Sequence, residues 1–373
     1  MRAVISSARL LLASTALISG VATQAETLQE ALDKALSENP ALESQRATAR
    51  ARAERPVQAR GAFGPTVTAS GNYQYNRDRT VTGGVRVSDE DGFAPGYSLT
   101  LEQPLFTSGR LTANLNAAEA IAAIGQENLR GAQQGLIADV VTAYVSVRRD
   151  IALYGVAVQI RDLLNEQYNT TSERYRLRDV TATDLNQTDN RRKVAEARVK
   201  EALAAVQTSA AAYRRLVGQY PDNLAPLPEA PAVPALDTLY EQAETSSPAL
   251  LAARLNEIAS KESVAATRAE RGPTVSATVG GRRAALNPYR DNIHTNSVFA
   301  GVTVSMPIYT GGVLSSQIRE AEALNQADKF SVEQTRREVR QNIASNWNQA
   351  RSAEQANPIY EDAVLAAERA LSG

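Results

Sequence analysis

The sequence contains no cysteine and a single histidine, His294. Without thiols the chain cannot form disulfides, thiolate metal sites, a cysteine nucleophile or a lipid-modified amino-terminal Cys. One histidine leaves almost no material for a zinc site or a His-based catalytic triad. Carboxylates are many, but they are scattered along helical faces. We therefore expect neither an enzyme nor a metal centre.

The chain also lacks an excess of charge of either sign. Lys plus Arg number 40 and Asp plus Glu number 41, which gives a net charge of -1. No overall field therefore recruits nucleic acid or an anionic surface. The densest basic run, residues 191–193, has no interleaved aromatic residues, so we expect no nucleic-acid partner.

Only one long apolar run is present, Leu10–Val21, and it follows Arg2 and Arg9. It is shorter than the roughly 20 apolar residues of a membrane anchor, the alternative reading. Small residues before Glu26 offer a cleavage site, so residues 1–25 are predicted to be a signal peptide. Any later entry into a membrane would require strands that close into a barrel, which is a feature of bacterial outer membranes.

The segment from Tyr97 to about Tyr168 joins a strand to an unusually long helix. Apolar residues alternate with polar ones from Tyr97 to Leu105, the period of a strand with two unlike faces. After Gly109 the apolar spacing changes to three and four residues, which predicts an amphipathic helix. Its stripe consists of Leu136, Val140, Tyr144, Val147, Ile151, Tyr154 and Val158. No strong breaker interrupts positions 110 to 168, so the helix would be roughly 90 Å long.

A second strand-to-helix join follows about 200 residues later, and other features recur with it. Two residues of the first join, Pro104 and Gly109, match Pro307 and Gly312 at a separation of 203. At a separation of 208, Leu28 matches Leu236, Pro40 matches Pro248, and Gly64–Pro65 matches Gly272–Pro273. A constant separation over 40 residues indicates an internal duplication.

The duplication divides the mature chain into two repeats. Residues 26–220 form the first repeat and 236–373 the second, and five prolines mark 221–235 as a semi-rigid linker. Strands are predicted at about 66–75, 97–106, 274–281 and 298–308, with the Gly-Pro pairs opening the first and third. Polar residues 76–96 and 282–296 are predicted to be long surface loops. A sheet in water would show the same alternation, so the strands alone leave that alternative open.

The segment RYRLRDVTATDLNQ interrupts the stripe of the first long helix. Thr183 and Asp184 can cap a new helix, which runs to Gly218. Two antiparallel helices of this length make a helical hairpin.

These features together resemble the TolC family of outer-membrane efflux and secretion ducts. The resemblance is carried by ETLQEALDKALSENPAL, the Gly-Pro pairs, the joins QPLFTSGR and MPIYTGG, and RYRLRDVTATDL. It implies a mainly α fold with a small β part. Duplicated long helical hairpins would form an α-barrel tunnel, and four transmembrane strands per protomer would contribute to a trimeric twelve-stranded barrel.

The resemblance also implies a function and partners. The chain would be an outer-membrane channel with a periplasmic helical extension, used for passive type I protein secretion or multidrug efflux. Its partners would be two further copies, outer-membrane lipid, a periplasmic adaptor, and an inner-membrane pump or ABC exporter. No cofactor is implied. The rivals are a soluble periplasmic coiled-coil adaptor or scaffold, and a wall- or surface-binding structural protein.

The helix turn carries the one site that the resemblance suggests. In the family an Asp there faces the narrow periplasmic entrance, and Asp184, preceded by Thr183, occupies that position. A plain helix cap is the alternative role for Asp184. Arg178 stands where the family has Gly, which puts a tight turn and the adaptor contact in question.

The second repeat has no counterpart of the return helix at about 171–218. Compared with the family pattern, the chain lacks the last long helix. We therefore expect either a fragment or a truncated relative, with reduced or absent function because apolar stripes would be left uncovered.

Overall fold

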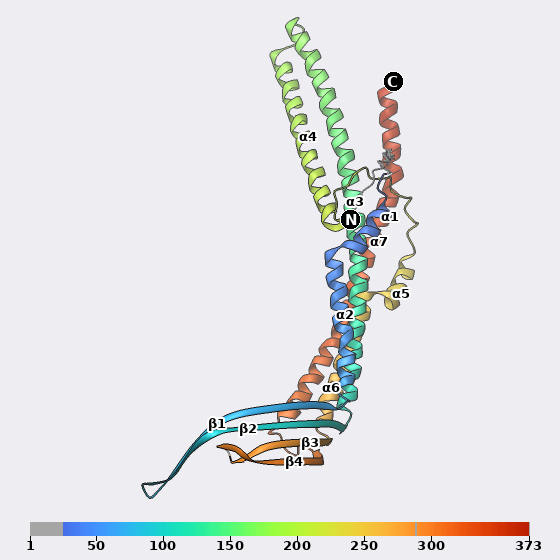
Figure 1. Cartoon of the computed structure of the whole chain (residues 1–373). Coiled ribbons are helices and arrows are strands. Elements are labelled where there is room, and N and C mark those ends of the chain that lie inside the picture. The colour runs from blue at the N-terminus through green and yellow to red at the C-terminus, as the bar shows by residue number, and fades with distance from the viewer. Residues whose placement is uncertain (1–24, 288, 373) are drawn as a thin grey trace, which may run out of the picture. The chain divides into compact units, whose positions relative to one another are not determined.

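The computed structural model describes residues 25–287 and 289–372, so nearly all of the expected signal peptide lies outside the described residues. Within these ranges the chain forms seven helices and four strands (Figure 1). They are α1 (Leu28–Glu38), α2 (Pro40–Gly61), β1 (Thr66–Thr82), β2 (Val85–Phe106), α3 (Arg110–Arg176), α4 (Ala182–Val217), α5 (Leu236–Ser246), α6 (Pro248–Ala269), β3 (Thr274–Asn287), β4 (Arg290–Ser305) and α7 (Val313–Ser372). The order helix, helix, strand, strand, helix occurs twice, as an internal duplication requires.

Internal contacts divide the chain into two compact units. One consists of Met1–Asn39 and Leu136–Glu229, and its described part holds α1, the second part of α3, and α4. The other consists of Pro40–Gly135 and Ala230–Gly373. It holds the sheet, α2, the first part of α3, α5, α6 and α7. Because α3 contributes to both, the units do not coincide with the two sequence repeats.

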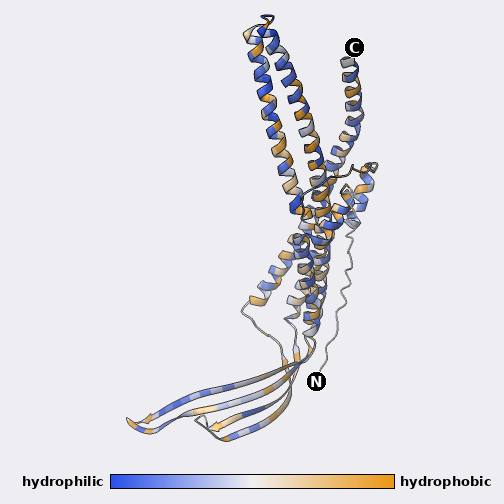
Figure 2. Ribbon diagram, turned by 45° about the horizontal axis from the view of Figure 1, so that its top comes forward, coloured by the Kyte–Doolittle hydropathy of each residue, from blue (hydrophilic) through white to orange (hydrophobic). Residues whose placement is uncertain are grey.

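In the first unit, α3 and α4 lie side by side as an antiparallel pair (Figures 1 and 2). The predicted stripes supply the core between them, and the rings of Tyr144 and Tyr213 lie 6.4 Å apart between centroids. Nearer the turn the stripe is exposed, with Ile151 47% accessible. The largest fully buried side chains of this unit are Val140, Tyr144, Val147, Tyr213 and Val217.

The start of the described chain is attached to this core by polar contacts. Glu26 forms a parallel bridge with Leu224. The hydroxyl of Tyr144 lies 2.9 Å from the carbonyl oxygen of Glu26 and 2.7 Å from that of Ala225, so it can donate to either. The hydroxyl of Tyr213 is buried without a hydrogen bond. The pKa of Tyr213 is raised, mainly because the ring is buried and secondly because the Glu26 carboxylate lies nearby. These contacts fix the segment before α1 against the segment after α4.

The sheet in the second unit has the strand order β1-β2-β3-β4, with every neighbouring pair antiparallel. Each strand is continuous with a helix of the same unit through a short join. Equivalent ion pairs connect the helices of the two repeats next to the sheet, one pair in each repeat. Arg60 contacts Glu119 at 2.7 Å, and Arg268, 208 residues after Arg60, contacts Glu322 at 2.5 Å. These pairs are exposed and therefore contribute little stability, but their equivalence supports the duplication.

The predicted surface loops 76–96 and 282–296 are wrong. The first segment lies in β1 and β2, and the described part of the second lies in β3 and β4 except for the turn at residue 289. The first hairpin turns only at Gly83 and Gly84, whose φ angles are +58° and +83°. A Gly-Gly pair suits a two-residue hairpin turn, which needs positive φ. The polar residues pair across the strands, as Arg77 does opposite Asp91. The polar residues of these segments predict exposure to solvent, but a strand with both faces exposed to solvent has the same composition. The fourth strand ends at Ser305, three residues earlier than predicted.

Candidate functional site

The sheet has one apolar and one polar face, and the register aligns them across all four strands. Val67 pairs with Leu101, Leu101 with Val279, and Val279 with Ala300. The adjacent row of small polar residues points to the opposite side, and Figure 2 shows the alternation along the strands. The apolar face consists of Val67, Ala69, Leu99, Leu101, Val275, Ala277, Val279, Val298, Ala300, Val302 and Val304. The other face includes Thr66, Thr68, Ser70, Ser98, Thr100, Ser276, Thr278, Thr303 and Ser305.

The apolar face is uncovered within the described chain. Val67 is 64% exposed, Val279 49% and Val298 88%. An exposed apolar surface of this extent marks an interaction with a membrane or another protein. The free edges of β1 and β4 also present unpaired backbone groups, which call for further strands.

The two glycines that the sequence pattern placed at the strand-to-helix joins have equivalent backbone conformations. Gly109 and Gly312 have φ angles of +89° and +83°, and the preceding residues, Ser108 and Gly311, are also left-handed at +53° and +61°. The carbonyl of Gly109 accepts the first intrahelical bond of α3, and that of Gly312 the first of α7. Glycine is suited to this position because it adopts positive φ without strain. A left-handed backbone at the start of each long helix therefore accounts for glycine at both joins.

The Gly-Pro pairs open β1 and β3 at equivalent turns. The amide of Gly64 donates to Gly61 and that of Gly272 to Ala269, both at 3.0 Å. Pro65 and Pro273 each precede the first strand residue. The structure adds a contact that spacing could not predict: the Ser108 hydroxyl donates to the carbonyl of Pro273 at 2.7 Å. The end of the first hairpin is thereby attached to the start of the second.

The two prolines of the joins have different environments. Pro104 lies within β2 beside an irregularity between Pro104 and Phe106 in the pairing with β3. A proline is tolerated there because the bulge removes the need for its missing N–H. Pro307 lies beyond the end of β4, so its predicted place inside a strand is wrong.

The helix turn is tight although Arg178 occupies the critical position. Arg178 has a φ of +64°. Its amide donates to Tyr175 at 3.0 Å, and the amide of Asp179 donates to Arg174 at 2.9 Å, the two bonds of a Schellman cap. The Arg174 guanidinium and the Asp179 carboxylate also pair at 2.7 Å. Arg178 therefore does not prevent a tight turn, although its place in the sequence had put one in question.

The cap of the next helix is Thr181, not Thr183. The Asp184 amide donates to the Thr181 hydroxyl at 3.2 Å, and the Asp184 carboxylate accepts from the Thr181 amide at 2.9 Å, a reciprocal capping box. Thr183 is exposed within the first turn instead. The sequence pattern T-x-x-D beginning at Thr181 could have located this cap.

The capping box holds Asp184 in its charged form. Hydrogen bonds from Thr181 lower the pKa of the Asp184 carboxyl below its usual value. The contribution of this carboxylate to the turn is complete above the usual Asp pKa and is lost as pH falls through the lowered one. Asp184 is exposed, so it also remains available to a partner.

Replacing Arg178 with glycine is expected to stabilise the turn by about 0.5 to 1 kcal/mol, because glycine removes the left-handed strain of a side-chain-bearing residue. Hydrogen exchange of the backbone amides at positions 178 and 179 should slow by roughly two- to fivefold. The matched control Arg178→Ala keeps the strain and should leave exchange unchanged. Equal slowing in both variants would contradict this explanation.

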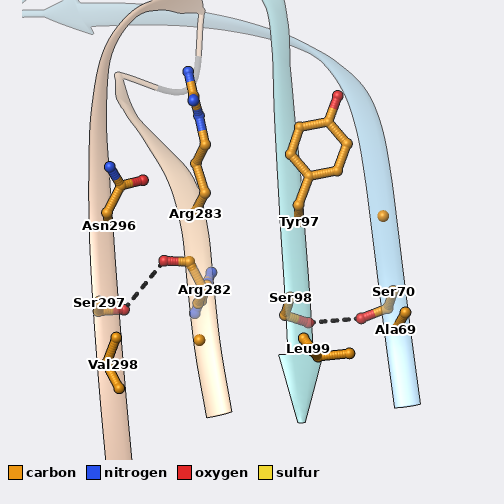
Figure 3. A pocket seen from close by; sticks show the side chains of 12 residues that line it. Ala69, Ser70, Tyr97, Ser98, Leu99, Arg282, Arg283, Asn296, Ser297 and Val298 are labelled. Carbon is orange, nitrogen blue, oxygen red and sulfur yellow. Dashed lines mark hydrogen bonds between the residues drawn. The ribbon is translucent and has the colours of Figure 1, made fainter. Parts of the chain in front are cut away.

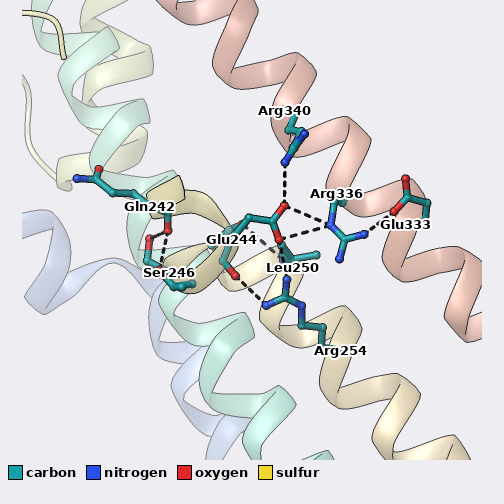
Figure 4. A network of polar contacts seen from close by, with 10 residues as sticks. Gln242, Glu244, Ser246, Leu250, Arg254, Glu333, Arg336 and Arg340 are labelled. Carbon is teal, nitrogen blue, oxygen red and sulfur yellow. Dashed lines mark hydrogen bonds and ion pairs between the residues drawn. The ribbon is translucent and has the colours of Figure 1, made fainter. Parts of the chain in front are cut away.

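A polar network that the sequence did not reveal joins α5, α6 and α7 (Figure 4). The Glu244 carboxylate contacts the guanidinium groups of Arg254 at 2.7 Å, Arg336 at 3.2 Å and Arg340 at 3.4 Å. Arg254 also donates to the Glu244 carbonyl at 2.7 Å, and Arg340 lies over the Tyr240 ring. Each side chain has its partners inside the network, which indicates a structural role.

Among residues 25–287 and 289–372, no three His, Asp or Glu side chains are grouped closely enough to hold a metal ion. Across the same part of the chain, no helix combines the length and apolar character that crossing a bilayer requires.

Comparisons with known proteins agree on one family. The profile of the family described as outer membrane efflux protein matches residues 31–219 and 239–372. The outer membrane efflux protein BepC of Brucella suis is 32% identical over 97% of this chain and 78% of its own length. The outer membrane protein TolC of Escherichia coli is 25% identical over 94% of this chain and 73% of its own length. The fold matches the outer membrane protein VceC of Vibrio cholerae with a TM-score of 0.73 at 19% identity, over 92% of this chain and 83% of that one.

Proposed function

Since the chain belongs to the outer membrane efflux protein family and is a subunit of an outer-membrane export channel, we propose that three copies assemble into one passive duct. Family members are channel and transport proteins, and we propose no catalytic step and no cofactor for this one. Each copy would contribute four strands to a barrel of twelve, and the helices would continue the duct into the periplasm.

The two-faced, open-edged sheet is the observation that carries this proposal. Its exposed apolar face suits the lipid around a barrel, and its polar face of Thr and Ser side chains suits the water inside the barrel. β1 and β4 are free edges, and only pairing with other copies can satisfy their backbone groups in lipid. A periplasmic scaffold with the same strands would leave this apolar face in water, which favours the channel over that rival.

We infer the partners from the apolar face of the sheet and from the exposed turn between α3 and α4, each taken by itself. Outer-membrane lipid would cover the apolar face of the sheet. The exposed turn around Asp184 and Arg178 would receive a periplasmic adaptor, which connects to an inner-membrane pump or ABC exporter. The duct would take its specificity from that pump, whether the cargo is a drug, as in efflux, or a protein, as in type I secretion.

Fractionation of cells that express the chain with its leader tests the proposal. We expect the protein in the outer membrane, running as a trimer on a gel when unheated and as a monomer after boiling. The purified protein should conduct ions across a planar lipid bilayer. A monomer that remains in the periplasmic fraction without detergent would contradict the channel and favour the scaffold.

A further inference from the structure

The apolar face of the sheet contains a groove, whose lining side chains are shown in Figure 3, and it is open above Gly281. On the other side of β2 the Tyr97 ring lies over Gly71, 3.5 Å from where a methyl group there would be. Gly71 and Gly281 flank β2, where Tyr97 and Leu99 project from the same face. A methyl group added at Gly281 would have no neighbour closer than 3.9 Å, so the space above this glycine is open. Leu99 and the 88% exposed Val298 form apolar walls. The groove therefore has an open floor at Gly281 and apolar walls, which suit a hydrocarbon chain.

A cationic side chain lies at the end of this groove that is farther from the helices. Arg283 shares the apolar face with Tyr97 and Asn296, which pair with it from the neighbouring strands. It is exposed, and its guanidinium lies 3.4 Å from a ring nitrogen of His294. Among the described residues no carboxylate forms an ion pair with Arg283. By contrast, the arginines nearer the tip of the first hairpin, at positions 77, 79 and 86, all pair with Asp89.

The height of Arg283 places it at a membrane boundary. Arg283 is nine residues from the start of β3, and Asn296 is nine from the end of β4. Tyr75 and Tyr97 stand nine residues from the ends of β1 and β2 that adjoin the helices. At about 3.3 Å per residue and a tilt of about 40°, nine residues rise roughly 23 Å. That is close to the height of the apolar band of an outer-membrane barrel, roughly 25 Å. Tyrosine rings at this level are typical of the interface.

We propose that the groove binds one acyl chain of the phosphorylated glycolipid of the outer leaflet, with its phosphate held by Arg283. This inference rests on the proposed function, because it requires the apolar face to lie in lipid and the hairpin tips to point outward. A guanidinium can bind a phosphate through two parallel hydrogen bonds. The Tyr97 hydroxyl and the Asn296 amide can hydrogen-bond sugar hydroxyls. Charge complementarity therefore favours a lipid with phosphate on a sugar over a zwitterionic phospholipid.

Titration of the full-length protein, purified from the outer membrane in detergent, tests the site. The probes are bisphosphorylated lipid A, the same lipid with its phosphates removed, phosphatidylglycerol and phosphatidylethanolamine, with bound lipid counted by native mass spectrometry. We expect lipid A with its phosphates to bind most tightly. Arg283→Gln should weaken that binding roughly tenfold, the usual effect of removing a charge-assisted hydrogen bond.

Two further variants separate the groove from nonspecific attraction. Gly281→Leu fills the open groove and should weaken binding while leaving Arg283 in place. Arg282→Gln removes the same charge from the adjacent position, which faces the other side of the sheet, and should leave binding unchanged.

Three outcomes would overturn the site. Arg282→Gln and Arg283→Gln could weaken binding equally, phosphatidylglycerol could bind as tightly as lipid A, or Gly281→Leu could have no effect. If the same preparation still forms a conducting trimer, the lipid site fails and the channel function stands. A protein that never reaches the outer membrane would overturn both.

Discussion

Arginine in place of Val279 is expected to prevent the chain from accumulating as a folded protein in the outer membrane. Val279 lies on the apolar face, five residues from the start of β3. This distance corresponds to a height of about 13 Å, close to the middle of the apolar band. A lipid-facing arginine at that depth costs about 2 to 4 kcal/mol, and in a trimer the cost arises in every subunit. Western blotting of outer-membrane fractions, with unheated and boiled samples, measures the effect.

Thr278→Arg is the matched control for Val279→Arg. Thr278 is the neighbouring residue in β3 and points to the polar face. An arginine there would remain in water, so the trimer should form in nearly normal amounts. Similar loss in both variants would show that the apolar face does not contact lipid. Loss in the Thr278 variant alone would show that the two faces have been assigned the wrong way round.

Gly272→Ala is expected to destabilise the connection between the two hairpins by about 1 to 3 kcal/mol, the usual cost of overpacking. A methyl group at Gly272 would lie 2.2 Å from the Ser108 hydroxyl oxygen and 2.5 Å from its Cβ. Rotation of the Ser108 side chain cannot relieve the second contact. The midpoint of thermal unfolding, followed by the helical circular dichroism of the purified protein, should fall by several degrees.

A double-mutant cycle tests whether Ser108 is the cause. Ser108→Gly removes both clashing atoms, so Gly272→Ala should cost much less in that background than alone. Gly61→Ala serves as a control in the equivalent join, because a methyl group there meets no atom within 4 Å. If Gly272→Ala costs the same with and without Ser108, the contact between the hairpins does not explain the requirement for glycine.

Much of the fold could be predicted because the spacing of apolar residues along the chain differs between strands and helices. The change from alternation to a spacing of three and four at Gly109 located the join. The constant separations between equivalent residues revealed the duplication, and Gly109 and Gly312 both have positive φ angles at the joins. The channel family followed from the same motifs.

The errors have physical causes as well. The hairpins extend to Gly83 and Gly84 because backbone pairing stabilises strands whose side chains are polar on both faces, a case that composition cannot distinguish from a loop. The cap was misplaced by two residues because Thr181 and Thr183 are both suitable capping residues. Only the backbone geometry around Asp184 selects the first.

By itself the sequence determined the order of helices and strands, the duplication, the two faces of each strand and the family of export channels. The order of the elements and the two faces depend on residues close together in the chain, and the duplication is a repeat that the sequence shows directly. Only the tertiary structure decided which strands are neighbours. With them it decided the groove above Gly281, the position of Arg283 beside Tyr97, the contact of Ser108 with Pro273 and the network around Glu244. Each of these brings together residues far apart in sequence, and strand register and helix packing, rather than any local pattern, fix such contacts.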